Sequence, residues 1–360
     1  MTVSRRRFLE LAGAALTVPP LTSCSSVDKV ATAGVPRSPF NEDSTAEEVT
    51  AGVDLSGRVA VVTGCTSGIG FETMRVLAKR GASVIGTSRS LEKAEVACER
   101  VTGITSPVQL ELSDFESVVS CAESIRTLGH ERPLDILVCN AGYRGGGNER
   151  QLVNGIEKHF VVNHLGHVVL VNRLLDRLFL ARQGRIVVVA SRAAYRDAPP
   201  GGIDFADLAM SRGYSDSAAY GQSKLANVLF SLRLAELLRG TRVTTNSLHP
   251  GVINTDIDRH LNPLTRFGFG LLTKLAGKTI EEGAATSCYV ATSGLLGSIS
   301  GHYFEDCNAI TIRAERHMHD GAMAEELMRV SEELTADYLV EQEHPERTDF
   351  ERGARGKTEG

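Results

Sequence analysis

The stretch Arg58-Val-Ala-Val-Val-Thr-Gly-Cys-Thr-Ser-Gly-Ile-Gly70 decides the fold of this chain. Its first half is rich in β-branched residues and predicts a strand, and a helical pattern follows at residues 71–80. A glycine-rich turn between a strand and a helix is typical of a phosphate-binding loop. Gly64 permits the tight turn, Gly68 lets a pyrophosphate approach the backbone, and Gly70 lets the helix pack against the strand. The sequence therefore predicts a dinucleotide-binding fold.

Strand and helix patterns alternate through the rest of the chain. Further strand-like runs occur at residues 82–87, 108–112, 134–139, 184–191, 241–248 and 301–305. Amphipathic helix patterns lie between or after them, at residues 160–180, 220–238, 281–291 and 322–339. Such alternation produces a parallel sheet with helices on both faces. We therefore expect an α/β protein with a single doubly wound Rossmann domain at residues 53–340, whose mostly parallel sheet has about seven strands.

Composition limits the classes of protein that this chain could represent. An apolar fraction of 42% in 360 residues suffices for a large core and excludes global disorder. The net charge of −5 shows no basic excess, so we expect no nucleic-acid partner. The cysteines at positions 65, 98, 121, 139, 288 and 307 form no CxxC pair, and His164 and His167 have no Cys or acidic partner at metal spacing. We expect neither a metal nor a disulfide framework, and we interpret the two histidines as structural.

A tyrosine and a lysine four residues apart, in Tyr220-Gly-Gln-Ser-Lys224, are candidates for acid–base chemistry. On a helix they lie one turn apart on the same face. An ammonium beside a phenol favours the phenolate and lowers its pKa from about 10 towards neutrality. Such a phenol can donate and accept a proton near neutral pH. Taken alone, the spacing also suits a solvated helix face.

The order and context of these motifs resemble the short-chain dehydrogenase/reductase family. The resemblance covers about residues 54–340 and is strongest to the branch with retinol dehydrogenases and the WW-domain oxidoreductase. The spacing G-x-x-x-G-x-G at residues 64–70 is characteristic of this family and differs from the general spacing G-x-G-x-x-G. Three residues depart from the family pattern: Glu111 replaces an Asp, Cys139 replaces an Asn, and Ala190 replaces the first residue of a Ser-Ser pair. The long connection from Ser191 to Tyr220 resembles an insertion of that branch.

The resemblance implies a catalytic set of Asn163, Ser191, Tyr220 and Lys224. Tyr220 would exchange a proton with the substrate oxygen, and Lys224 would lower the pKa of Tyr220 and bind the nicotinamide ribose. Ser191 would orient the substrate oxygen, and Asn163 would bend its helix and hold a water for proton relay. The resemblance also implies contacts to the cofactor from Gly64, Ser67, Gly68, Ile69, Gly70, Glu111, Leu112, Asn140, Ala141, Gly142, Tyr220, Lys224, Pro250, Gly251, Val252 and Thr255.

The end of the second expected strand, Ser88-Arg89, indicates which dinucleotide the site takes. NAD-preferring enzymes of this kind usually carry an acidic residue there, which binds the ribose hydroxyls. This chain has no acid at that place, and the guanidinium of Arg89 suits a 2′-phosphate. We therefore expect NADP rather than NAD, although Arg89 also fits a solvated loop.

These features predict an NADP-dependent oxidoreductase that interconverts an alcohol and a carbonyl on a small molecule by hydride transfer. Apolar residues are frequent at positions 257–278, which cap the substrate cleft in the family. They favour an apolar substrate, but an ordinary packed helix explains them equally well. The alternative function is an NADP-binding regulatory scaffold with little turnover, and the presence of all four catalytic residues argues against it. A monomer and a homo-oligomer both fit the sequence.

The amino terminus resembles a bacterial export signal. Ser4-Arg5-Arg6-Arg7-Phe8-Leu9 is a twin-arginine pattern, and the apolar run at residues 11–18 is too short to span a bilayer. Leu21-Thr-Ser-Cys24 resembles a lipobox, which would make Cys24 a lipidated membrane tether. We therefore expect residues 1–24 to direct the protein to the cell envelope, the alternative being a disordered tail on a cytoplasmic protein. Residues 25–52 predict a linker, and residues 341–360 predict a disordered tail.

Overall fold

The computed structural model describes residues 28–129, 132–145, 147, 149–251, 278–313 and 316–342. The expected export signal with Cys24, most of the expected carboxyl-terminal tail and the apolar residues 257–277 lie outside this range. Val252 and Thr255, two of the expected cofactor contacts, also lie outside it. Within the described residues, no helix is both long and apolar enough to cross a lipid bilayer.

Strand β2 (Val59–Thr63) lies in the middle of the central sheet, between β3 (Ser83–Ser88) and β5 (Ile136–Cys139). All of its residues are buried, because both faces of the sheet are covered. Alternate residues belong to two separate core clusters, Val61 to one and Val62 to the other. The unbroken β-branched run in the sequence follows from this burial on both faces.

Seven strands of the sheet are parallel, which confirms the predicted doubly wound α/β fold. Their spatial order is β4-β3-β2-β5-β8-β9-β10, with β4 at Ile104–Gln109, β8 at Gly184–Val189, β9 at Val243–His249 and β10 at Tyr303–Glu305. The order reverses direction between β2 and β5. Open α/β sheets bind their ligands beside such a switch point, at the carboxyl ends of the strands.

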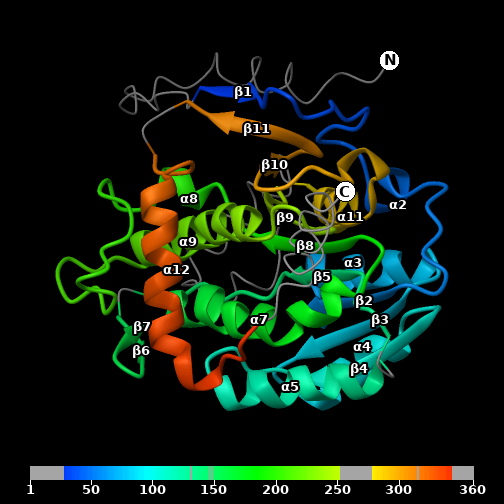
Figure 1. The fold of residues 1–360 in the computed structure, drawn as a ribbon, viewed down its shortest axis with the longest axis horizontal. Coiled ribbons are helices and arrows are strands. Elements are labelled where there is room, and N and C mark those ends of the chain that lie inside the picture. The colour runs from blue at the N-terminus through cyan, green and yellow to red at the C-terminus, as the bar shows by residue number, and fades with distance from the viewer. Residues whose placement is uncertain are drawn as a thin grey trace, which may run out of the picture.

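Helices form a layer on each face of the sheet (Figure 1). One layer contains α5 (Phe115–Leu128), α7 (Gly166–Phe179), α9 (Asp216–Leu237) and α12 (Gly321–Thr335). The other contains α2 (Ala46–Val49), α3 (Gly68–Lys79), α4 (Leu91–Glu99) and α11 (Ile280–Thr292). The shorter elements are β6 (Leu152–Val153), β7 (Ile156–Glu157), α6 (Lys158–Phe160), a π-helix (Val161–Leu165), α8 (Ala193–Arg196) and 3-10 turns at Gly294–Leu296 and Ala336–Tyr338. The six cysteines among the described residues are buried thiols.

Two antiparallel strands extend the sheet beyond the expected seven (Figure 1). β11 (Asn308–Ile312) forms a hairpin with β10, and β1 (Lys29–Ala31) pairs with β11 at the edge. β1 and α2 lie within residues 25–52, where the sequence predicted a linker. A strand of three residues is too short to give a periodic signal, and β1 depends on distant partners such as Glu305, which pairs with Lys29. Among the described residues, the sheet therefore has nine strands.

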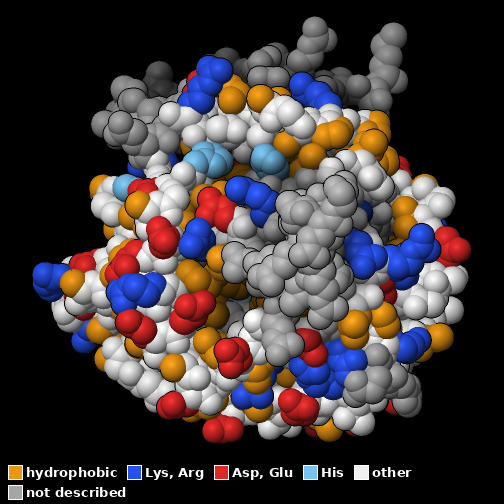
Figure 2. Space-filling model, in the orientation of Figure 1, with side chains coloured by type: hydrophobic (Ala, Val, Ile, Leu, Met, Phe, Trp, Pro, Cys, Tyr) orange, Lys and Arg blue, Asp and Glu red, His pale blue; other side chains and the backbone are white. Residues whose placement is uncertain are grey.

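Charged side chains of both signs are mixed on the molecular face shown in Figure 2. Lys and Arg lie among Asp and Glu over the described residues of this face, in agreement with the net charge of −5. Apolar side chains are visible between them, as on most protein surfaces.

Candidate active site

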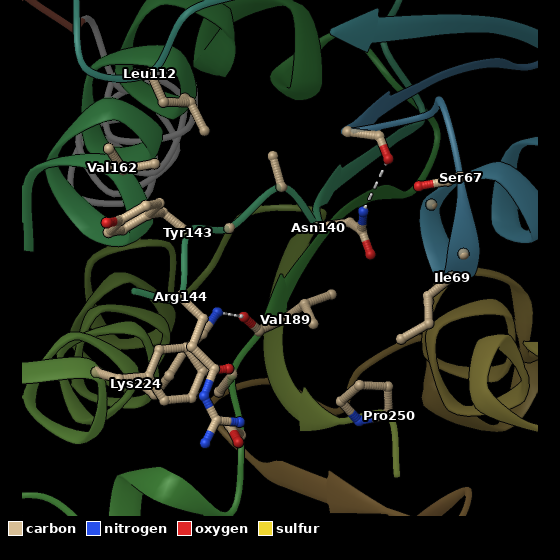
Figure 3. A pocket seen from close by; sticks show the side chains of 18 of the residues that line it. Ser67, Ile69, Leu112, Asn140, Tyr143, Arg144, Val162, Val189, Lys224 and Pro250 are labelled. Atoms are coloured by element: carbon tan, nitrogen blue, oxygen red, sulfur yellow. Dashed lines mark hydrogen bonds between the residues drawn. The ribbon is translucent and has the colours of Figure 1, made fainter. Parts of the chain in front are cut away.

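A cavity of about 710 Å³ lies at the carboxyl ends of the parallel strands. It adjoins the switch point between β2 and β5 and extends to β8 and β9 (Figure 3). Its wall contains sixteen of the predicted site residues, namely Gly64, Ser67, Gly68, Ile69, Gly70, Arg89, Glu111, Leu112, Asn140, Ala141, Gly142, Ser191, Tyr220, Lys224, Pro250 and Gly251. Asn163 is buried behind Tyr143, which does line the cavity. The predicted cofactor loop and the predicted catalytic pair thus meet in one site.

The glycine-rich loop leaves room for a ligand close to its backbone. Gly64 and Gly68 have φ angles of 74° and 59°, in the left-handed region that favours glycine. A Cβ at Gly70 would lie 2.1 Å from the carbonyl oxygen of Gly64 and 2.4 Å from Nδ2 of Asn140. Helix α3 begins at Gly68, and the Ser67 side chain makes no capping hydrogen bond to it. The first amides of α3 therefore face the cavity, where the helix dipole favours a negative charge.

Thr63, the last residue of β2, holds the segment after β5 against this loop. Its hydroxyl accepts hydrogen bonds from the backbone N–H groups of Asn140 and Ala141, both at 2.9 Å. The side-chain amide of Asn140 donates in return to the Thr63 carbonyl oxygen at 2.8 Å. Two neighbouring strands are thus joined at the point where the cavity begins.

Basic and hydroxyl side chains surround the end of the cavity where β3 meets α4. Arg89 lies there together with Ser90 and with Lys93 from the first turn of α4. The sequence interpretation overlooked Lys93, whose signal is its place three residues after the helix N-cap Ser90. Glu111 also lines the cavity, but its carboxylate accepts hydrogen bonds from the Ser113 backbone N–H and hydroxyl, at 3.0 and 2.7 Å. The basic groups at this end can therefore bind a phosphate.

Tyr220 and Lys224 lie one turn apart on α9, and both line the cavity. Lys224 is 2% exposed, and its ammonium donates to the carbonyl oxygen of Val189 at 3.0 Å (Figure 3). Burial lowers the pKa of Lys224 to about 8, because the charged ammonium loses its hydration. The Nζ atom lies 5.7 Å from the centroid of the Tyr220 ring. The lysine is thus held beside the phenol, where its charge favours the phenolate.

Asn163 lies in the π-helix between β7 and α7 and contacts neighbouring elements. Its Oδ1 accepts a hydrogen bond from the Tyr143 backbone N–H at 2.6 Å. Its Nδ2 donates to the Tyr143 carbonyl oxygen at 3.0 Å and to the Ser223 hydroxyl at 2.9 Å. The Ser223 hydroxyl in turn donates to the Tyr220 carbonyl oxygen at 2.8 Å. Asn163 therefore ties the loop after β5 to the helix that carries Tyr220 and Lys224, and π turns of this kind are frequent at functional sites.

Three further residues surround Tyr220 that the sequence did not single out. The guanidinium carbon of Arg144 lies 5.0 Å from the centroid of the Tyr220 ring, and Tyr143 lines the cavity beside it. The buried His159 ring lies 6.1 Å from the Tyr220 ring, centroid to centroid, and its Nε2 accepts a hydrogen bond from the Gly145 backbone N–H at 2.9 Å. The signal for Tyr143 and Arg144 is that they directly follow Asn140-Ala-Gly, whereas His159 belongs to no motif.

The turn after β9 closes another side of the cavity, through Pro250 and Gly251. His249, just before this turn, is 5% exposed and also lines the cavity. Burial holds the pKa of His249 well below its usual range, so the ring is neutral at physiological pH. Neither ring nitrogen has a hydrogen-bond partner among the described residues. The turn therefore presents a neutral imidazole near Ser191.

Comparison with known proteins identifies clear relatives. The family model for short chain dehydrogenase matches residues 58–203. Retinol dehydrogenase 12 of Homo sapiens is 40% identical over 290 residues, which cover 78% of this chain and 87% of that protein. The WW domain-containing oxidoreductase of Gallus gallus is 37% identical over 317 residues, which cover 84% of this chain and 74% of that protein. These are the two kinds of protein that mark the branch predicted from the sequence.

Solved structures with the same fold extend over most of the chain. An uncharacterized protein from Mycobacterium paratuberculosis has a TM-score of 0.63 and 30% identity, and the match covers 82% of this chain and 98% of that protein. The Pseudomonas aeruginosa RhlG/NADP active-site complex has a TM-score of 0.55 and 25% identity, and the match covers 70% of this chain and 95% of that one.

Proposed function

Because this chain belongs to the short-chain dehydrogenase/reductase family, and is an oxidoreductase of alcohols and carbonyls, we propose that it uses NADP(H) at the Tyr220/Lys224 site. The observation that carries the proposal is the cavity itself, whose wall joins the glycine-rich loop to this pair. Its substrate is a small molecule that reaches Ser191 and Tyr220 from the remaining part of the cavity.

The residues of the cavity fit a dinucleotide. The uncapped first turn of α3 favours a pyrophosphate, and the absence of a side chain at Gly70 lets α3 approach the turn after β2. When bound, a nicotinamide cofactor supplies or accepts the hydride, which amino-acid side chains cannot do. Arg89 and Lys93 would hold the phosphate that distinguishes NADP from NAD. A solved relative that contains NADP supports this choice.

The side chains of this protein would supply the proton and the orientation. Tyr220 is the general acid in carbonyl reduction and the general base in alcohol oxidation. The ammonium of Lys224 stabilises the phenolate that remains after Tyr220 has given up its proton. The Ser191 oxygen accepts a hydrogen bond from the Ala193 N–H at 3.2 Å, which leaves its own hydrogen for donation to the substrate oxygen.

Arg89→Ala is expected to raise the KM for NADPH by about 10–100-fold and to leave the KM for NADH nearly unchanged. The reason is the loss of a charged hydrogen-bond donor to the 2′-phosphate, which NADH lacks. Steady-state kinetics with both cofactors measure the effect. Arg239→Ala, at an exposed arginine outside the cavity wall, is the control. Equal losses with the two cofactors would show that Arg89 does not contact the 2′-phosphate.

The rate of carbonyl reduction is expected to fall as the pH rises through about 8, where Lys224 loses its proton. Below this pH the ammonium is present and supports Tyr220; above it, the charge disappears and kcat/KM falls by about tenfold per pH unit. The measurement is kcat/KM for the carbonyl substrate from pH 6 to about 10. A profile that stays level over this range would contradict the role of Lys224.

A panel of alcohols and carbonyls, tested with NADPH/NADP⁺ and NADH/NAD⁺, examines the proposed function directly. The expectation of an apolar substrate depends on residues 257–278, nearly all of which lie outside the described range. The panel therefore contains apolar and acidic compounds of graded length. Turnover with NADPH supports the proposal, whereas NADPH binding without turnover of any compound indicates the regulatory scaffold.

A further inference from the structure

His164 and His167 are buried on neighbouring helical turns and contact different parts of the fold. Both form hydrogen bonds within the protein, in agreement with the interpretation that they are structural. His164 shares a hydrogen bond of 2.8 Å between its Nε2 and the Ser331 hydroxyl of α12, away from the cavity. His167, in the first turn of α7, is 2% exposed and lies between the two halves of the site. Its Nε2 lies 3.1 Å from the Thr63 hydroxyl, and its Nδ1 lies 3.2 Å from the Asn163 carbonyl oxygen.

The partners of His167 determine where its proton lies. A carbonyl oxygen can only accept, so the contact with Asn163 requires the hydrogen on Nδ1. In the neutral ring Nε2 must then accept, and its donor is the Thr63 hydroxyl at 3.1 Å, whose other acceptor, the Val138 carbonyl oxygen, lies farther away at 3.4 Å. The oxygen of Thr63 keeps its lone pairs for the N–H groups of Asn140 and Ala141. Burial lowers the pKa of His167 to about 4, which agrees with a neutral ring at physiological pH.

The two partners of His167 belong to opposite sides of the cavity. Thr63 holds the Asn140-Ala141 segment beside the glycine-rich loop. The side chain of Asn163 holds Tyr143 and, through Ser223, the helix that carries Tyr220 and Lys224. A single imidazole thus connects the hydrogen bonds of the cofactor side with those of the catalytic side.

We propose that His167 is a positioning residue. Its neutral Nδ1–H tautomer holds the glycine-rich cofactor loop and helix α9, which carries Tyr220 and Lys224, in fixed positions relative to each other. Its Nε2 contact orders the cofactor side through Thr63, and its Nδ1–H contact orders the catalytic side through Asn163. This inference rests on the proposed NADP-dependent function for its kinetic consequence. The tautomer and the two contacts are properties of the protein without cofactor or substrate, so they do not depend on that function.

Two substitutions separate the contacts. His167→Asn keeps a donor at the δ position for the Asn163 carbonyl but loses the acceptor for Thr63. NADPH is then expected to bind about tenfold more weakly, with kcat within about threefold of the wild type. His167→Gln keeps an acceptor at the ε position for Thr63 but loses the Nδ1–H donor. It is expected to lower kcat by about tenfold while NADPH affinity stays within about threefold. Fluorescence titration with NADPH measures binding without any substrate.

His164→Leu is the matched control, because it removes a buried histidine one turn away that contacts α12 and not the site. It is expected to lower Tm and to change NADPH affinity and kcat by the same factor. His167→Leu, which removes both contacts, is expected to lower both quantities. Equal losses of affinity and kcat in His167→Asn and His167→Gln, in proportion to the change in Tm, would overturn the proposal.

The tautomer is measured on the wild-type protein by ¹⁵N nuclear magnetic resonance with histidine labelling, and a variant is needed only to assign the signal. The expected result at pH 7 is a protonated Nδ1 and an unprotonated Nε2, assigned to His167 by loss of the signal in His167→Asn. The opposite tautomer or a doubly protonated ring would overturn the proposal. Absence of turnover in the wild type would refute the proposed function and leave the tautomer and the NADPH titration as the deciding measurements.

Discussion

Tyr220→Phe is expected to lower kcat by about 10²–10⁴-fold in both directions of the reaction. The substitution removes the hydroxyl to which we assign the proton transfer and retains the ring, which is 8% exposed and packs beside Arg144 and His159. The hydrogen bond from Lys224 to Val189 does not involve that hydroxyl. NADPH affinity is therefore expected to change by no more than about fivefold, since a single hydrogen bond contributes ~1 kcal/mol. Steady-state kinetics and NADPH titration measure the two quantities.

Tyr338→Phe is the matched control for this substitution. Its ring packs against Phe115 at 5.3 Å between centroids, and it does not line the cavity. It should retain wild-type kinetics. If Tyr220→Phe kept full activity on every substrate found, the acid–base role of Tyr220 would be refuted.

Gly70→Ala is expected to weaken NADPH binding by about a hundredfold and to lower the free energy of unfolding by ~1–3 kcal/mol. The new methyl group would lie 2.1 Å from the Gly64 carbonyl oxygen and 2.9 Å from the Gly64 carbonyl carbon. These are backbone atoms, so relief of the overlap requires α3 to move away from the turn after β2. That movement displaces the amides that face the cavity. NADPH titration and thermal unfolding measure the two effects.

Gly294→Ala provides the control, because a Cβ at that glycine meets no atom within 4 Å. The control is expected to bind NADPH like the wild type. Wild-type affinity in Gly70→Ala would mean that the dinucleotide does not use the start of α3.

Local motifs made the fold and much of the cavity wall predictable from the sequence. The turn from Gly64 to Gly70 and the pair Tyr220/Lys224 each lie within one or two elements, so spacing along the chain determines spacing in the structure. The alternation of strand and helix patterns likewise predicted the seven parallel strands.

Contacts between distant elements could not be predicted in this way. Asn163 meets Ser223, which is 60 residues away, and His167 meets Thr63, which is 104 residues away. Periodicity shows which face of a helix is buried, but it does not show which side chains meet there. For the same reason His164 and His167 could be interpreted as structural without any indication of what they hold. The position of Arg144 over the Tyr220 ring also depends on the path of a loop.

Strand β1 is synthesised long before β11, the strand with which it pairs. Lys29 leaves the ribosome early, yet its partner Glu305 follows 276 residues later. Closing so long a loop is entropically unfavourable and comes late in folding. Until then β11 is an open strand edge, the kind of surface through which nascent chains associate. Strand β1 can therefore pair with β11 only after residues 308–312 have been synthesised, and the pairing replaces an edge strand of five residues with one of three.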